Sequence, residues 1–183
     1  PEGRLRPLRS RVQVVFQDPN RSLNPRRTVG SSMVEGAMNF GLSKLHARQT
    51  AEELMDRIQL PRTALDRYPH QFSGGQRQRL AIARAIACQP QVLVADEAVS
   101  ALDVSVQAQI LDLLREIQRD LGLGILFITH DLRVAAQLCD RVIVMSQGRI
   151  VEQGPTGQVF GAPANDYTRR LLAAAPRAEL ASA

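Results

Sequence analysis

The chain has 183 residues, a length that suits one domain with a sizeable hydrophobic core. Hydrophobic residues make up 44% and charged residues 22%, which is ordinary for a globular protein. The formal net charge of +5 raises the question of nucleic-acid binding, but the arginines are spread along the chain, and five phenylalanines and two tyrosines are its only aromatic residues. This composition lacks the interleaved basic and aromatic residues of nucleic-acid sites. It favours a basic surface that faces solvent or a membrane protein.

The two cysteines, Cys88 and Cys139, lie in helical segments among apolar neighbours and show no metal-binding or redox spacing. We therefore expect a reducing, cytosolic compartment. No apolar run approaches the ~18 residues needed to cross a bilayer. Any role at a membrane is expected to come through a partner.

The first half of the chain predicts a strand followed by helices. Residues 11–16 have the pattern of a short buried strand, which ends in the turn-forming cluster 17–20, so that Gln17 stands at the carboxyl end of a strand. Residues 22–69 have helical patterning and are interpreted as a small helical insertion. Its clearest apolar positions, before Pro61 ends the run, are Ala51, Leu54, Met55, Ile58 and Leu60.

A helix is predicted to begin at Ser73 and to run to about Cys88. Ser73 and Gln76 have the spacing of a capping box, in which each side chain covers a free backbone N–H group of the other residue. Gly74 and Gly75 lower the helix propensity of this first turn, and the close backbone approach of a ligand would explain them. The positive end of a helix suits an anion such as phosphate. For the three residues Ser-Gly-Gly alone, an ordinary capped helix is the better explanation.

The second half of the chain alternates strands and helices. A buried strand over residues 92–95 ends in Asp96 and Glu97, and a long amphipathic helix follows, with Asp103 as its N-cap and Gly122 and Gly124 at its end. The inner side of this helix carries Val106, Ile110, Leu113, Leu114, Ile117 and Leu121. The next elements are a strand over 125–129 that ends in His130, a short helix capped by Asp131, and a fourth strand over 141–145 that Gly148 turns into residues 149–152. This alternation predicts an α/β fold with a parallel sheet covered by helices.

Polar side chains follow directly on separate predicted strands, and in parallel sheets the carboxyl ends of the strands line the ligand crevice. For an isolated glutamine or histidine, a turn or capping role is the better explanation. Together the residues suit phosphoryl transfer around Mg²⁺. In that interpretation Asp96 holds Mg²⁺ through water and Glu97 polarises the attacking water. Gln17 bridges metal and water, and His130 binds a γ-phosphate oxygen.

The string FSGGQRQRLAIARAI, residues 72–86, resembles the signature motif of ATP-binding-cassette (ABC) ATPases, usually LSGGQ. In that family the motif contacts the γ-phosphate of ATP held by a partner subunit, which implies nucleotide-binding roles for Ser73, Gly74, Gly75 and Gln76. Further motifs of the family follow in its usual order. They are a Q-loop at 15–18, a Walker B strand at 92–96 with Glu97 as catalytic base, a D-loop at 100–103 with Asp103 as a nucleotide contact, and a switch histidine, His130, within 127–131.

The resemblance implies a P-loop-NTPase-like, mostly parallel sheet flanked by helices, with a helical insertion. It also implies ATP and Mg²⁺ as cofactors. The implied partners are a second ABC ATPase subunit, in a homodimer or heterodimer, and membrane permease subunits, with no direct nucleic-acid partner. The implied location is cytoplasmic, peripheral on the inner face of the cell membrane.

A narrower resemblance points to the branch that energises import of dipeptides, oligopeptides, glutathione or nickel. It rests on residues 17–25, QDPNRSLNP, and 68–72, YPHQF, and on residues 163–172, which resemble the branch's C-terminal HPYT-type segment. Asn165-Asp166 stand where His-Pro is usual, and Ala98-Val99 stand where Pro-Thr is commonest. Neither change removes a reacting group.

No P-loop, GxxxxGK[S/T], occurs in the 183 residues, and the only lysine, Lys44, lies in the helical insertion. In the family the P-loop precedes the Q-loop, but here sixteen residues precede Gln17 and the first of them is Pro1. We therefore expect the chain to be the carboxyl-terminal part of a longer ATPase, inactive alone and prone to self-association through exposed strand edges. The expected parts are a remnant of the core sheet (1–16), the Q-loop, helical subdomain and signature helix (17–88), the Walker B to switch-histidine core (89–154) and a helical tail (155–183), alanine-rich and frayed from Ala173 onward.

Two other functions remain open from the sequence. The positive charge is compatible with a non-transport ABC ATPase that acts on nucleic acid or ribosomes. The missing P-loop is compatible with a catalytically dead regulatory or dimerisation fragment, although Asp96, Glu97 and His130 favour an active parent enzyme. Co-purification with a permease or with RNA would separate transport from nucleic-acid roles.

Overall fold

The structure, a computed structural model, describes residues 2–174 and divides the chain into two compact units, 1–128 and 129–183. The expectation of a frayed tail from Ala173 onward falls mostly on residues 175–183, which lie outside the described part.

The first unit is built on a parallel sheet of three strands, β1 (Val12–Val15), β2 (Val92–Asp96) and β3 (Gly124–Ile128), in the order β1-β2-β3. In the register of the sheet, Val15 lies beside Ala95, which lies beside Phe127. The three strands predicted from apolar runs are thus confirmed, and their carboxyl ends lie at one edge. A helix that the sequence did not reveal, α1 (Glu2–Arg11), precedes β1.

The helical insertion between β1 and β2 is confirmed. It contains α2 (Val29–Asn39) and α3 (Lys44–Arg57), together with the 3₁₀ turns η1 (Pro19–Arg21), η2 (Arg62–Asp66) and η3 (Pro69–Gln71). Buried Ala51, Leu54 and Met55 form the inner side of α3. The side chain of Ser43 accepts a hydrogen bond from the His46 N–H group, so the chain's only lysine stands in the first turn of an ordinary capped helix.

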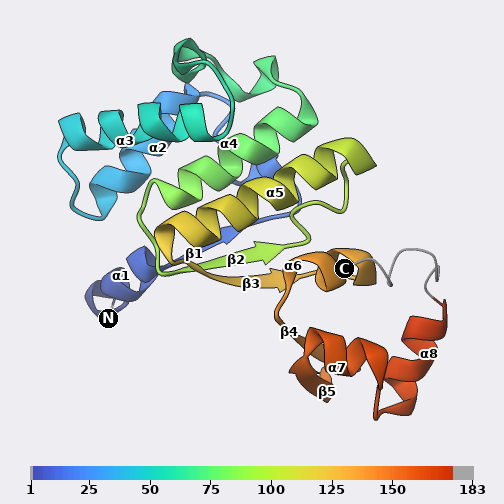
Figure 1. The fold of residues 1–183 in the computed structure, drawn as a ribbon. Helices are drawn as coiled ribbons and strands as arrows, with labels where there is room; N and C mark the ends of the chain where they lie inside the picture. The colour runs from blue at the N-terminus through green and yellow to red at the C-terminus, as the bar shows by residue number, and fades with distance from the viewer. Residues whose placement is uncertain (1, 175–183) are drawn as a thin grey trace. The chain divides into compact units, whose positions relative to one another are not determined.

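Helices α4 (Gly74–Ile86) and α5 (Val104–Leu121) lie side by side over one face of the sheet (Figure 1). Leu93 and Ala95 of β2 are fully buried on this face. Gly122, at a φ of 61°, ends α5 in the left-handed conformation that glycine adopts without cost. Leu121 was predicted to face inward, but its side chain is 51% exposed. A helix of 18 residues is about 27 Å long and a strand of five about 17 Å, so the last turn of α5 extends past the sheet.

The opposite face of this sheet is open in the described residues of the first unit (Figure 1). Val12 is 43% exposed, Val92 36%, Leu126 51% and Ile128 46%, and strand alternation puts all four side chains on this face. Parallel sheets normally have both faces covered. In the first unit taken by itself, this face of the sheet is therefore apolar and uncovered.

The second unit contains α6 (Leu132–Leu138), the strands β4 (Arg141–Ser146) and β5 (Arg149–Pro155), α7 (Thr156–Gly161) and α8 (Asp166–Ala174). The fourth predicted strand, β4, does not continue the parallel sheet but pairs antiparallel with β5. Gln147 and Gly148 both have positive φ, 49° and 73°, as a two-residue hairpin turn requires. This short turn makes β5 the nearest pairing partner of β4.

The segment that departs from the HPYT pattern has a clear local structure. The side chain of Asn165 accepts a hydrogen bond from the Tyr167 N–H group at 2.8 Å, in the first turn of α8. Both carboxylate oxygens of Glu152 on β5 accept backbone N–H groups, from Ala164 at 2.7 Å and from Asn165 at 3.2 Å. Asp166 pairs with Arg169 one turn later. Asn165 therefore starts α8 without the His-Pro pair.

Candidate functional site

The signature segment begins α4 with the predicted capping box. The Ser73 side chain accepts from the Gln76 N–H group at 3.3 Å, and the Ser73 N–H group donates to Gln76 Oε1 at 3.0 Å. Ser73, Gly74 and Gln76 are exposed, and Gly75 is half-buried. The helix start is thus ordered by its own side chains and is open to a ligand on one side.

The two glycines of this segment have different surroundings. A Cβ atom added to Gly75 would lie 2.5 Å from Val106 Cγ1 on α5, far inside contact distance. A Cβ atom added to Gly74 would meet nothing within 4 Å among the described residues. Gly75 is therefore required by the packing of α4 against α5, whereas the space beside Gly74 is open and can admit a ligand.

A rigid turn, missed in the sequence, holds the chain just before Ser73. The Tyr68 N–H group donates to Gln71 Oε1 at 2.8 Å, and Arg67 Nη2 donates to the Gln71 carbonyl oxygen at 2.7 Å. The Arg67 guanidinium also lies 4.7 Å from the centre of the Phe72 ring, and Phe72 is buried. The YPHQF string thus fixes the direction from which the signature helix begins.

At the strand ends, the structure brings Gln17 and Glu97 together through Ser100. Gln17 Nε2 donates to Ser100 Oγ at 3.0 Å. Ser100 Oγ lies 3.0 Å from the Glu97 carbonyl oxygen and 3.4 Å from Glu97 Oε2, so its hydroxyl can donate to either. Ser100 belongs to the expected D-loop string, but no spacing in the sequence indicates that it connects these two residues. The connection spans 83 residues of the chain.

Glu97 has an unusual backbone conformation. Its φ is 48°, in the left-handed region, which costs a residue other than glycine roughly 1–2 kcal/mol. The Glu97 N–H group donates to the Ile128 carbonyl oxygen at 2.9 Å, and the Ser100 N–H group donates to the Glu97 carbonyl oxygen at 3.1 Å. Strained residues that are held this way cluster at functional sites. The conformation is consistent with a role for the Glu97 carboxylate beyond folding.

Asp96 and Gln17 are the predicted Mg²⁺ ligands. Asp96 ends β2 and is half-buried beside Ile128 of β3. The amide nitrogen of Gln17 is engaged by Ser100, which leaves its carbonyl oxygen as the group that can accept from water or bind a cation. No cluster of three His, Cys, Asp or Glu residues in the described residues could hold a metal. One carboxylate and one amide oxygen fit Mg²⁺, which usually takes few protein ligands besides phosphate and water.

Asp103 is the N-cap of α5. Its Oδ1 accepts the Val106 N–H group at 2.9 Å and the Ser105 hydroxyl at 3.0 Å, and these bonds, the backbone one first, lower the pKa of the carboxyl group. Because Val106 also faces Gly75, the capped starts of α4 and α5 adjoin. The capping role is structural, and a nucleotide contact of Asp103 stays a prediction.

His130 belongs to the second unit, where it is exposed and precedes the N-cap of α6. Asp131 Oδ1 accepts the Arg133 N–H group at 2.9 Å, and Arg133 Nη2 lies 2.9 Å from Asp131 Oδ2. The Asp131 N–H group donates to Thr129 Oγ1 at 2.9 Å. The residues on both sides of His130 are thus bonded to each other. Its role as switch histidine stays a prediction.

The stability of α6 is expected to depend on pH through Asp131. The side-chain bond with Arg133, ahead of the backbone bond, lowers the pKa of Asp131 in the folded protein. The stabilisation that the Asp131 carboxylate contributes is therefore present above its unfolded pKa of about 4, and it is lost as pH falls through its pKa in the folded protein. We expect Asp131→Asn, which keeps a good cap, to flatten the acid-side loss of amide protection in α6, measured by hydrogen exchange. Asp140→Asn is the control, and an unchanged acid profile in D131N would contradict the assignment.

No helix in residues 2–174 is both long enough and apolar enough to span a membrane. Within the first unit, the described site thus comprises a capped helix start, motif residues at the ends of β1 and β2, and a helical insertion. The solved structure of cbiO1 from Clostridium perfringens, described as part of the ABC transporter complex cbiONQ, has the same fold. The two share a TM-score of 0.77 and 33% identity over 93% of this chain and 66% of that one. The expected P-loop-NTPase-like α/β fold is confirmed.

The chain belongs to the ABC transporter family, because residues 2–100, more than half of its length, match that family. It is 51% identical over 180 residues to the glutathione import ATP-binding protein GsiA of Escherichia coli (strain K12). It is 48% identical over 173 residues to a putative peptide import ATP-binding protein of Brucella ovis. These matches cover 97% and 94% of this chain but 29% and 55% of the relatives, so the chain spans less than two thirds of either.

Proposed function

We propose that this chain is part of the ATP-binding and ATP-hydrolysing subunit of an importer for peptides or related small solutes such as glutathione. The observation that carries the proposal is 51% identity, over nearly the whole chain, to glutathione import ATP-binding proteins. The hydrogen bonds that link Gln17, Ser100 and Glu97 support it, because these residues come from three of the motif segments.

In this function each motif residue of the chain has a distinct task. Asp96 and Gln17 would hold Mg²⁺, which neutralises charge on the phosphates when bound. Glu97 orients and polarises the attacking water, and His130 binds the γ-phosphate. Ser73 to Gln76, together with Asp103, contact the ATP held by a second subunit, through the exposed start of α4.

The 183 residues contain no GxxxxGK[S/T] loop. The proposed activity therefore belongs to a protein that combines them with a P-loop, which we call the intact cassette. The backbone N–H groups and the lysine of such a loop supply the main grip on the phosphates. Alone, these residues present the hydrolytic edge of one site and the signature segment for another.

The proposed partners are a second ATPase subunit and membrane permease subunits, which would place the protein in the cytoplasm, peripheral to the inner face of the membrane. A hollow of about 460 Å³ in the helical insertion is a suitable permease contact. It lies at α2 and the start of α3, and combines apolar Val34 and Met38 with charged Arg27, Glu35, Lys44 and Arg48. The proposed coupling route runs from this insertion to Gln17.

The intact cassette is expected to hydrolyse Mg-ATP and to co-purify with membrane permease subunits in mild detergent. The isolated 183-residue polypeptide is expected to show negligible turnover and no binding in a calorimetric titration with Mg-ATP, because it lacks the P-loop. Co-purification with RNA instead of a permease would contradict the transport function. Stoichiometric Mg-ATP binding by the isolated polypeptide would show that nucleotide is held without a P-loop.

A further inference from the structure

Gln78 is a buried polar residue that the motifs leave without a role. It lies on α4, and its side chain is 1% exposed. Glutamine is rarely buried so completely, and a buried amide needs hydrogen-bond partners. Its Nε2 atom donates to the Phe16 carbonyl oxygen at 3.3 Å, across 62 residues of sequence. The signature helix therefore carries a side chain whose visible task is to hold the chain at residue 16.

The Phe16 carbonyl group, which accepts the hydrogen bond from Gln78, is the last carbonyl group before Gln17. Strand β1 ends at Val15, so the Phe16 carbonyl group is outside the paired part of the sheet and Gln78 supplies its donor. The Gln17 side chain bonds in turn to Ser100, which lies against Glu97. A continuous path of contacts thus runs from α4 to the carboxylate at the end of β2.

The neighbouring residue of α4 holds the other end of the same turn. Arg77 Nη1 lies 3.4 Å from Asn20 Oδ1. The Asn20 N–H group and side-chain nitrogen both donate to Asp18 Oδ1, at 2.9 and 2.8 Å. Residues 16–20 are therefore attached to α4 at two points, through the buried amide of Gln78 and through the half-buried side chain of Arg77.

We infer that Gln78 is a positioning residue that ties Gln17 to the signature helix, so that the segment contacting the partner's ATP and the water-activating edge of this subunit move together. The inference rests on the proposed function. Gln78 touches no reacting group. Its loss is expected to lower kcat and to leave KM for ATP nearly unchanged, because the P-loop supplies the main grip on ATP. A misplacement of about 1 Å can cost about 100-fold in rate, and we expect a loss of about tenfold or more.

The test compares two substitutions in the intact cassette. Gln78→Met keeps the size of the side chain and removes the donor. Gln78→Glu places a buried carboxyl against a carbonyl oxygen, which raises its pKa and disfavours the charged form, while its protonated form can donate to Phe16. The ratio of kcat in Q78E to kcat in the unmodified protein should therefore rise as pH falls from about 8 to about 6, whereas the ratio for Q78M stays flat.

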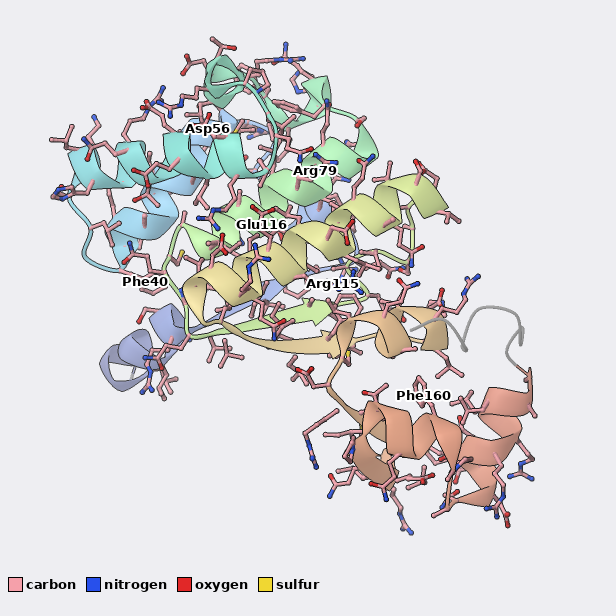
Figure 2. The ribbon with its side chains drawn as sticks, in the orientation of Figure 1. Phe40, Asp56, Arg79, Arg115, Glu116 and Phe160 are labelled. Atoms are coloured by element: carbon pink, nitrogen blue, oxygen red, sulfur yellow. The ribbon has the colours of Figure 1, made fainter. Side chains whose placement is uncertain are left out.

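Gln109→Met is the matched control. Arg79, labelled in Figure 2, reaches from α4 to Gln109 on α5 and to the Ile58 carbonyl oxygen after α3, so Q109M breaks a bond of the same helix away from residues 16–20. We expect Q109M to keep its kcat. Unchanged kcat in Q78M, or a flat pH ratio in Q78E, would overturn the inference.

A second readout does not depend on ATP hydrolysis. In Q78M the amide protons of residues 20–23, which bond within this turn, should exchange faster than in the unmodified protein, and in Q109M they should not. If the intact cassette shows no Mg-ATPase activity, the proposed function is wrong. The amide-exchange measurement then still tests whether Gln78 holds residues 16–20 in place. Equal exchange in Q78M and the unmodified protein would defeat the inference about Gln78 itself.

Discussion

Replacing Glu97 by glutamine should lower the ATP turnover of the intact cassette by about 10²- to 10⁴-fold, the range that a positioned general base contributes. Glutamine has the size of glutamate and an oxygen that can still accept from the Ser100 hydroxyl, but it cannot take a proton from water. It also bears the same left-handed backbone cost at this position. The melting temperature and the dissociation constant for Mg-ATP should therefore stay close to those of the unmodified protein.

Single-turnover hydrolysis and equilibrium binding of Mg-ATP measure the two parts of this prediction separately. Glu53→Gln is the control, because Glu53 is an exposed carboxylate on α3 outside the site. Turnover retained in E97Q would remove Glu97 from the role of general base. Weakened ATP binding in E97Q, with turnover per bound nucleotide unchanged, would assign the carboxylate to binding instead.

The features that the sequence predicted correctly depend on neighbouring residues. The capping box at Ser73 and Gln76 spans three positions, and the strand before Asp96 is an unbroken apolar run, so both can be read from a short window. Parallel pairing then puts residues that follow the strands at one edge without further information. That is sufficient to place Gln17 near Glu97.

The features that the sequence did not show depend on residues far apart along the chain. Ser100 lies 83 positions from Gln17 and Gln78 lies 62 from Phe16, and neither pair has a spacing that a periodic pattern reveals. Only the packed structure shows that Gln78 is buried, since glutamine is usually exposed. The sequence predicted the turn at Gly148 but not that β4 and β5 form a separate antiparallel sheet, because an apolar strand has the same pattern in either kind of sheet.

The two glycines of the signature segment should respond in opposite ways to alanine. Gly75→Ala puts a Cβ atom 2.5 Å from Val106 Cγ1, and overpacking of this kind costs about 1–3 kcal/mol. Gly74→Ala meets no atom within 4 Å and removes freedom from the unfolded chain, which stabilises by about 0.4–1 kcal/mol where the backbone is compatible. In thermal unfolding of the intact cassette, G75A should melt several degrees lower than the unmodified protein and G74A should not.

The effects of the two variants on ATP turnover should differ from their effects on stability, because the two added Cβ atoms would occupy different spaces. The Cβ atom of G74A enters the open space at the exposed start of α4, so G74A should lose ATP turnover while keeping its stability. The Cβ atom of G75A points at α5, so the defect of G75A should be one of packing.

Val106→Ala removes the methyl group that clashes with the added Cβ atom. The double variant G75A/V106A should therefore recover both melting temperature and turnover relative to G75A, with a coupling energy of about 0.5–3 kcal/mol. Full turnover in G74A would mean that the partner's nucleotide does not approach at Gly74, and additive effects in the double variant would mean that the contact with Val106 does not set the need for glycine at position 75.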